Sequence, residues 1–89
     1  MVYVGNLKFP FGRMLMSHMV ADTYKELHEM ADKIGVNRKW FQAHEIHPHY
    51  DICQSKKALA IKYGAIEMPD REMAKKFRWD LRIRYKNLL

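Results

Sequence analysis

The clearest alternation of apolar and polar positions predicts a helix over residues 23–34. Apolar side chains recur there at helical spacing, and Gly35 follows as a stop signal. Asp22 is the expected N-cap of this helix. The same kind of pattern predicts a second helix over residues 53–63 and a third helix that Asp70 caps. The third helix carries a stripe that we expect to be buried, formed by Met73, Phe77, Leu81, Tyr85 and Leu88.

Short β-branched and aromatic runs predict about four strands between and before these helices. The expected strands span residues 2–4, 14–20, 38–42 and 65–68. Segments 8–13 and 44–51 contain Pro and polar residues, and we expect irregular loops there. The order β-β-α-β-α-β-α predicts an α/β fold, with α+β as the alternative, in a small sandwich. The 89 residues are expected to form one domain, with a basic helix over residues 70–89 packed on it.

Charge and cysteine content narrow the class of protein. The chain has 16 Lys and Arg against 10 Asp and Glu, and the net charge of +6 favours anionic partners. Its single cysteine, Cys53, cannot form an internal disulfide and fits a reducing compartment, so we expect a cytoplasmic location. No apolar run reaches the roughly 18 residues that a membrane span needs. We therefore expect no membrane association.

The densest group of chemically active side chains lies in segment 44–53. If this segment is extended, the two-residue period of a strand places His47, His49, Asp51 and Cys53 on one face. His47, His49 and Asp51 could hold a divalent metal ion and support phosphoester hydrolysis, with His49 as the general base. The simpler interpretation is a solvated loop. A buried, hydrogen-bonded histidine is the expected state of His18, which lies in an apolar segment.

Another set of residues favours binding of a phosphorylated ligand. Ser55, Lys56 and Lys57 open the second helix, where free backbone N–H groups attract anions. Arg13 on a glycine-containing loop could clamp a phosphate, and Trp40 could stack on a base. Surface lysines and core aromatics are the simpler explanation. The predicted ligand-binding residues are Arg13, Trp40, Gln42, His49, Tyr50, Asp51, Ser55, Lys56 and Lys57.

Several segments together resemble a small family of bacterial and phage proteins, the domain of unknown function 4031. The resemblance covers residues 2–68 and leaves out the basic last helix. It rests on residues 2–4, 10–14, 18–19, 21–22, 26–32, 38–42, 48–52, 55–57 and 64–65. The resemblance brings no established activity. It implies an acidic pair where this chain has Gly5 and Asn6, and a cysteine where it has Ser17, so the departures favour ligand binding without turnover.

The sequence thus predicts a non-catalytic, cofactor-free binding module for a small phosphorylated ligand, most simply a nucleotide. In a phage, acting in the host cytoplasm, it would sequester a host signalling nucleotide. One alternative is a metal-assisted phosphoesterase or nuclease that uses a divalent ion. Another is a nucleic-acid-associated protein that uses the basic last helix, where residues 70–89 carry seven basic and three acidic side chains. Trp79 and Ile83 lie opposite the apolar stripe and predict a homodimer or higher homo-oligomer.

Overall fold

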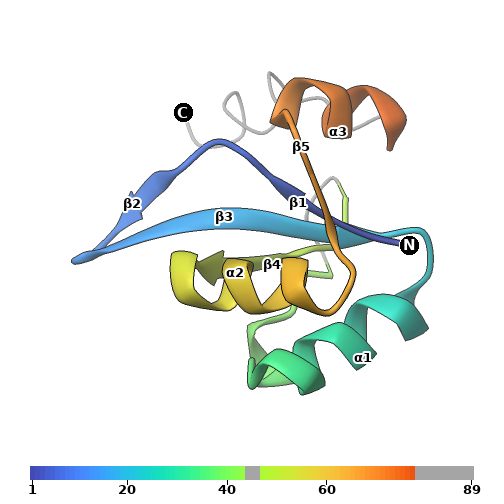
Figure 1. Cartoon of the computed structure of the whole chain (residues 1–89), viewed down its shortest axis with the longest axis horizontal. Coiled ribbons are helices and arrows are strands. Elements are labelled where there is room, and N and C mark those ends of the chain that lie inside the picture. The colour runs from blue at the N-terminus through green and yellow to red at the C-terminus, as the bar shows by residue number, and fades with distance from the viewer. Residues whose placement is uncertain (44–46, 78–89) are drawn as a thin grey trace.

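The computed structural model describes residues 1–43 and 47–77, which fold around one mixed sheet (Figure 1). The strands are β1 (Val2–Gly5), β2 (Phe9–Phe11), β3 (Met14–Ala21), β4 (Tyr50–Cys53) and β5 (Ile66–Met68). The helices are α1 (Tyr24–Ile34), α2 (Gln54–Lys62) and α3 (Asp70–Lys76), with a short 3-10 helix η1 (Arg38–Trp40). The described part is therefore a small α+β domain.

Strand β3 organises the sheet because three other strands pair with it. Met16 pairs with both Phe9 of β2 and Cys53 of β4, so these two strands lie on opposite edges of β3. Met19 pairs with both Val4 of β1 and Tyr50 of β4, so β1 lies on the same edge of β3 as β2. All three pairings are antiparallel, and β5 adds to β1 in parallel. The register of β3 and β4 brings His18 directly opposite Asp51.

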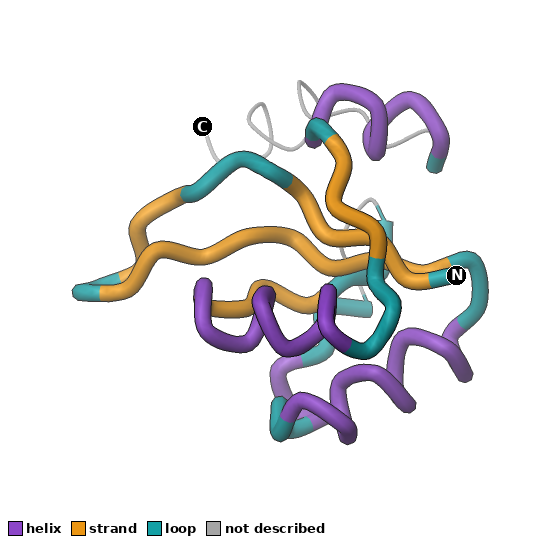
Figure 2. The backbone as a smooth tube through the Cα atoms, viewed as in Figure 1, coloured by secondary structure: helices purple, strands orange, loops and turns teal. Residues whose placement is uncertain are grey.

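The helices cover the two faces of the sheet unequally. Helices α1 and α2 lie on one face, and α3 lies on the other, as Figures 1 and 2 show. The main core forms beneath α1 and α2, from alternate residues of the strands. Its buried members include Val4, Met19, Leu27, Met30, Ile34, Tyr50 and Ile52. A smaller cluster beneath α3 joins Tyr3, Val20 and Met73, with Phe77 packed against it.

Helix α1 confirms the prediction over residues 23–34 because its ends carry local signals. The Thr23 hydroxyl accepts a hydrogen bond from the Glu26 backbone N–H, and Gly35 takes the left-handed conformation at φ 78°. Thr23, and not Asp22, is therefore the N-cap. Helix α2 also confirms its prediction. In α3, Pro69 and not Asp70 is the N-cap, because the Asp70 carboxylate accepts from the Leu7 backbone N–H instead of capping its own helix.

Three short segments differ from the predicted order. Segment 8–13 contains β2, because an outer strand tolerates Pro10. Residues 38–40 form η1 instead of a strand, since the Asn37 side chain caps a tight turn there. Strand β4 lies in a segment predicted to be mainly loop, where buried Tyr50 and Ile52 alternate with more polar neighbours. The observed order is therefore β-β-β-α-β-α-β-α.

Other predictions fall outside the described residues. They concern the last helix beyond Phe77, including the rest of its apolar stripe and most of its basic residues. Trp79 and Ile83, on which the expected homo-oligomer depends, lie there as well. None of the helices in the described part of the chain is long and apolar enough to cross a membrane.

Candidate metal centre

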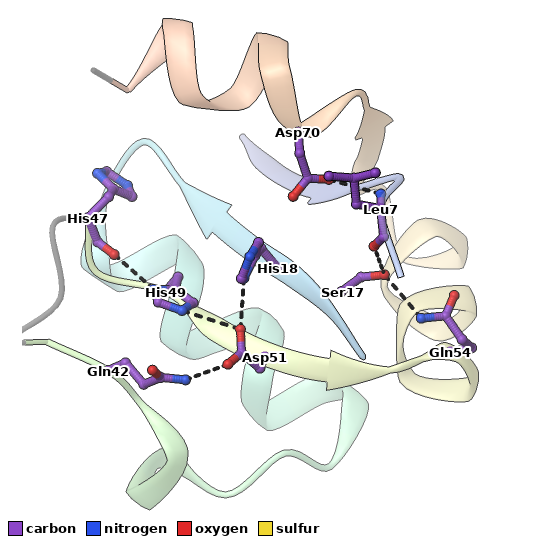
Figure 3. Close-up of polar contacts among 9 residues, drawn as sticks. All are labelled: Leu7, Ser17, His18, Gln42, His47, His49, Asp51, Gln54 and Asp70. Atoms are coloured by element: carbon purple, nitrogen blue, oxygen red, sulfur yellow. Dashed lines mark hydrogen bonds and ion pairs between the residues drawn. The ribbon is translucent and has the colours of Figure 1, made fainter. Parts of the chain in front are cut away.

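Two histidines and an aspartate meet on the sheet face that carries α3. Asp51 Oδ1 lies 2.8 Å from His18 Nδ1 and 3.2 Å from His49 Nε2 (Figure 3). The two imidazole rings stand almost perpendicular, with their centroids 5.1 Å apart. These three residues form the group that we call the metal centre. His18 is buried and hydrogen-bonded, as predicted, but it was not among the residues predicted to form a site.

The local backbone fixes the orientation of the His49 ring. His49 Nδ1 lies 2.9 Å from the carbonyl oxygen of His47, so this nitrogen must carry a proton and donate it. In the neutral ring, Nε2 then presents its lone pair to Asp51 Oδ1. Two acceptors face each other in this tautomer, and a cation bound between them relieves the repulsion. Donation to a backbone carbonyl is also how proteins orient histidine ligands of metals.

Strand pairing and the segment before β4 hold Asp51 in place. Gln42 forms an isolated bridge with His49, and its side-chain amide donates to Asp51 Oδ2 at 2.7 Å. Both carboxylate oxygens are therefore engaged. The site is sheltered, since the His49 side chain is 0% exposed and that of Asp51 is 19% exposed.

The electrostatic balance at Asp51 strongly favours its charged form. Burial alone raises the pKa of the carboxyl group. The contacts with His18 and His49 and the hydrogen bond from Gln42 hold the pKa of Asp51 well below its usual range. The carboxylate therefore stays ionised at any physiological pH, as a metal ligand must.

The spacing of the three donor atoms suits a metal ion. One nitrogen from each histidine and one Asp51 oxygen lie within 4.8 Å of one another. Bonds of about 2.0–2.2 Å to a common ion place neighbouring donor atoms about 2.8–3.6 Å apart, from octahedral to tetrahedral geometry, and the observed 2.8 and 3.2 Å lie in this range. Two nitrogens and one oxygen are donors that zinc and similar transition metals accept.

His47 and Cys53 lie next to the metal centre without belonging to it. His47 contributes its carbonyl oxygen, while its ring points away from Asp51 and lies 4.7 Å from the Phe77 ring (Figure 3). Burial, and then the charge of His49, lower the pKa of His47. Cys53 follows Asp51 on the same side of β4. The Ser55 hydroxyl lowers the pKa of the Cys53 thiol against the effect of burial, assisted by backbone N–H groups at the start of α2.

The structure separates most of the predicted phosphate-binding residues. Tyr50 is fully buried and its hydroxyl lies 2.7 Å from His28 Nδ1, so its ring cannot stack on a ligand. Lys57 is 5% exposed and forms an ion pair with Glu67 at 2.7 Å. Lys56 extends toward Gly35 at the end of α1, which is a favourable place for a cation.

The remaining predicted residues lie at the surface or in the metal centre. Ser55 is exposed beside Cys53, and Arg13 is exposed in the turn between β2 and β3. Trp40 is 59% exposed, with the Lys39 ammonium 5.2 Å from its ring centroid. Of the nine predicted residues, hydrogen bonds and ion pairs bring together Gln42, His49 and Asp51.

The position of Gly5 has a structural explanation. A Cβ atom on Gly5 would lie 2.2 Å from Asp70 Oδ1, so the Asp70 carboxylate fills the space that a side chain at position 5 needs. Asp70 Oδ1 also accepts from the Leu7 backbone N–H, and the Asp70 N–H donates to Asn6. Nearby, Ser17 donates to the Leu7 carbonyl and accepts from Gln54 (Figure 3). These contacts tie α2 and α3 to the loop after β1.

Residues 2–79 match the family described as protein of unknown function (DUF4031), and the chain belongs to this family. The match confirms the resemblance and extends it past residue 68 through α3. No curated protein and no solved structure gives a significant match.

Proposed function

We propose that the protein is a metal-dependent phosphoesterase, with a divalent transition-metal ion held by His18, His49 and Asp51. The observation that carries this proposal is the convergence of three donor atoms within 4.8 Å on a sheltered part of the sheet. The residues come from β3, β4 and the segment just before β4, so a rigid sheet sets their geometry.

The number of donors favours catalysis over a structural role. Structural zinc sites usually have four protein ligands, whereas catalytic sites have three and leave a position for water or substrate. His18, His49 and Asp51 provide three. His49 acts here as a ligand, because its Nε2 atom faces Asp51, and not as the general base expected from the sequence.

Charge supports a phosphorylated substrate. The net charge of +6 raises the local concentration of anions around a small protein. Asp51 would repel a phosphate in the absence of a cation, so an ion between the carboxylate and the phosphate is electrostatically required. When bound, a divalent ion supplies Lewis-acid chemistry, since it polarises a phosphoryl oxygen and lowers the pKa of coordinated water.

The protein side chains have defined tasks in this proposal. Asp51 provides the negative charge that retains the ion, and Gln42 holds the carboxylate through Oδ2. The His47 carbonyl orients the His49 ring through Nδ1. The phosphoester bond breaks as water adds to phosphorus, and the leaving alcohol takes up a proton.

Binding of a phosphorylated ligand without turnover is the second candidate. It is favoured by the hydrogen bonds at Asp51, which occupy both oxygens and lower the pKa of the carboxyl group, so that Asp51 is a poor general base. The metal centre would then hold the phosphate without hydrolysing it.

One set of measurements separates these possibilities. The protein is stripped with chelator, reloaded with zinc, manganese or cobalt, and assayed with bis(p-nitrophenyl) phosphate and p-nitrophenyl phosphate. We expect one ion per chain and release of p-nitrophenolate that stops after chelation. Asp51→Asn keeps the size of the side chain but removes its charge, and we expect it to lose both the ion and the activity.

His28→Gln is the matched control, because His28 belongs to α1, on the opposite face of the sheet. It should retain the ion and the activity. Metal binding by the wild type without release of p-nitrophenolate, but with retention of phosphate, would support the second candidate. Absence of metal binding, or equal binding by Asp51→Asn, would exclude both forms of the proposal.

A further inference from the structure

The β2–β3 hairpin exposes large apolar side chains on the same sheet face as the metal centre. Phe11 is 66% exposed and Met14 is 49% exposed, and the two residues pair across the hairpin. Phe9 and Met16 form the next pair on this face. The Phe9 ring lies 4.7 Å from the His18 ring. These four residues, the hairpin strip, therefore lead from the metal centre to the tip of the hairpin.

Exposed basic side chains lie at both ends of β2. Lys8 precedes β2, Arg13 lies in the turn that follows it, and both are exposed. An exposed aromatic ring beside basic side chains is the combination that binds single-stranded nucleic acid, because bases stack on the ring while the cations attract phosphates. The net charge of +6 acts in the same direction.

The length of the strip indicates the size of the ligand. Arg13 and His18 are five positions apart in the sequence, and at about 3.3 Å per position this distance is about 17 Å along the strand. A ligand that contacts Arg13 and also places a phosphate at the metal centre must be longer than one nucleotide. The turn contains Gly12 at φ 60°, which keeps the hairpin tight at this end.

We infer that the hairpin strip binds single-stranded nucleic acid and delivers its backbone to the metal centre. This inference rests on the proposed function for the reaction itself, and it names the substrate class as a polynucleotide strand instead of a mononucleotide. The strip supplies stacking surfaces, Lys8 and Arg13 bind phosphates, and the metal centre acts on a phosphodiester bond. Hydrolysis of that bond adds water and yields two shorter strands.

The chain offers a matched pair of variants for the test. Met14 and Leu15 are equally exposed, at 49% each, but consecutive residues of a strand point to opposite faces. Binding of fluorescent single strands about 12 nucleotides long, one of DNA and one of RNA, is followed by anisotropy in chelator. Phe11→Ala should weaken binding by about 5- to 100-fold, the usual range for loss of a stacking contact. Met14→Ala should weaken binding less but still by several-fold, because an apolar contact beside the ring is lost. Leu15→Ala should change it by no more than about twofold.

A second pair tests the charges. Arg13→Gln and Lys33→Gln each remove one positive charge, but Lys33 lies in the last turn of α1, on the opposite side of the sheet. Arg13→Gln should weaken binding and reduce its salt dependence by the contribution of about one phosphate. Lys33→Gln should have a much smaller effect.

The use of chelator separates this inference from the proposed function. If strand binding depends on Phe11 and Met14 while no metal binds, the strip is supported and the phosphoesterase fails. If Leu15→Ala weakens binding as much as Met14→Ala, the inference is overturned. The same conclusion follows if thymidine monophosphate binds as tightly as the strand, or if no strand binds below about 100 μM.

Discussion

Asp51 joins parts of the chain that are far apart in sequence. Its two carboxylate oxygens contact His18 of β3, Gln42 after η1, and His49 just before β4. A change at this residue should therefore affect several elements at once. Substitution of one ligand at a time gives a cleaner assignment of the metal centre.

Substitutions of His18 and His47 should have opposite effects on zinc binding. We expect His18→Gln to weaken zinc binding by at least about 10-fold, because it removes a donor. His47→Gln should leave zinc affinity almost unchanged, since the backbone carbonyl that orients His49 remains. Titration calorimetry with stripped protein measures both. A loss of zinc affinity in His47→Gln but not in His18→Gln would support the set predicted from the sequence, namely His47, His49 and Asp51, and would contradict the structure.

Part of this site follows from local sequence. The two-residue period of a strand correctly places His49 and Asp51 on one face. The same period places Tyr50 on the opposite face, where it is buried in the core, so the period argues against Tyr50 as a stacking residue. His18 could not be added in this way. Its place depends on the register between β3 and β4, which pairs residues 33 positions apart.

At the scale of elements, helices were easier to predict than short strands. Helix α1 has a full amphipathic pattern, a cap and a glycine stop, so its ends follow from neighbouring residues. The four-residue strand β4 is stabilised by pairing with distant β3. The aromatic residues Trp40 and Phe41 suggested a strand, but Trp40 is exposed on η1.

The N-cap of α1 provides a test of this local account. Thr23→Ala should lower the free energy of unfolding by about 0.5–2 kcal/mol, because the Glu26 backbone N–H loses its acceptor. Asp22→Ala removes the neighbouring candidate cap and should cost less. Urea denaturation compares the two, and a larger loss for Asp22→Ala would show that the cap is misassigned.

The contact between β1 and α3 provides a second test at this scale. Gly5→Ala should destabilise the protein by about 1–3 kcal/mol, because its new methyl group meets the Asp70 carboxylate. The same substitution in an Asp70→Ala background should cost much less. Chemical denaturation of the four proteins completes a double-mutant cycle. Additive effects would mean that Asp70 does not fill this space.

At the scale of the whole molecule, exposed apolar surface favours association. The described residues leave Leu7, Phe11, Tyr24 and Trp40 more than half exposed, at 58%, 66%, 60% and 59%. We expect light scattering at micromolar concentration to give at least twice the chain mass of 10.7 kDa. A monomer mass that persists at high concentration would contradict this prediction.

The central claim is that one divalent ion binds among His18, His49 and Asp51. The most direct measurement is an anomalous difference map at the zinc absorption edge, from crystals of the full chain loaded with zinc. The account predicts one strong peak per chain, in bonding contact with His18 Nδ1, His49 Nε2 and Asp51 Oδ1. A peak at His28 or His47, or a map without a peak in which the hydrogen bonds between the three residues persist, would contradict it.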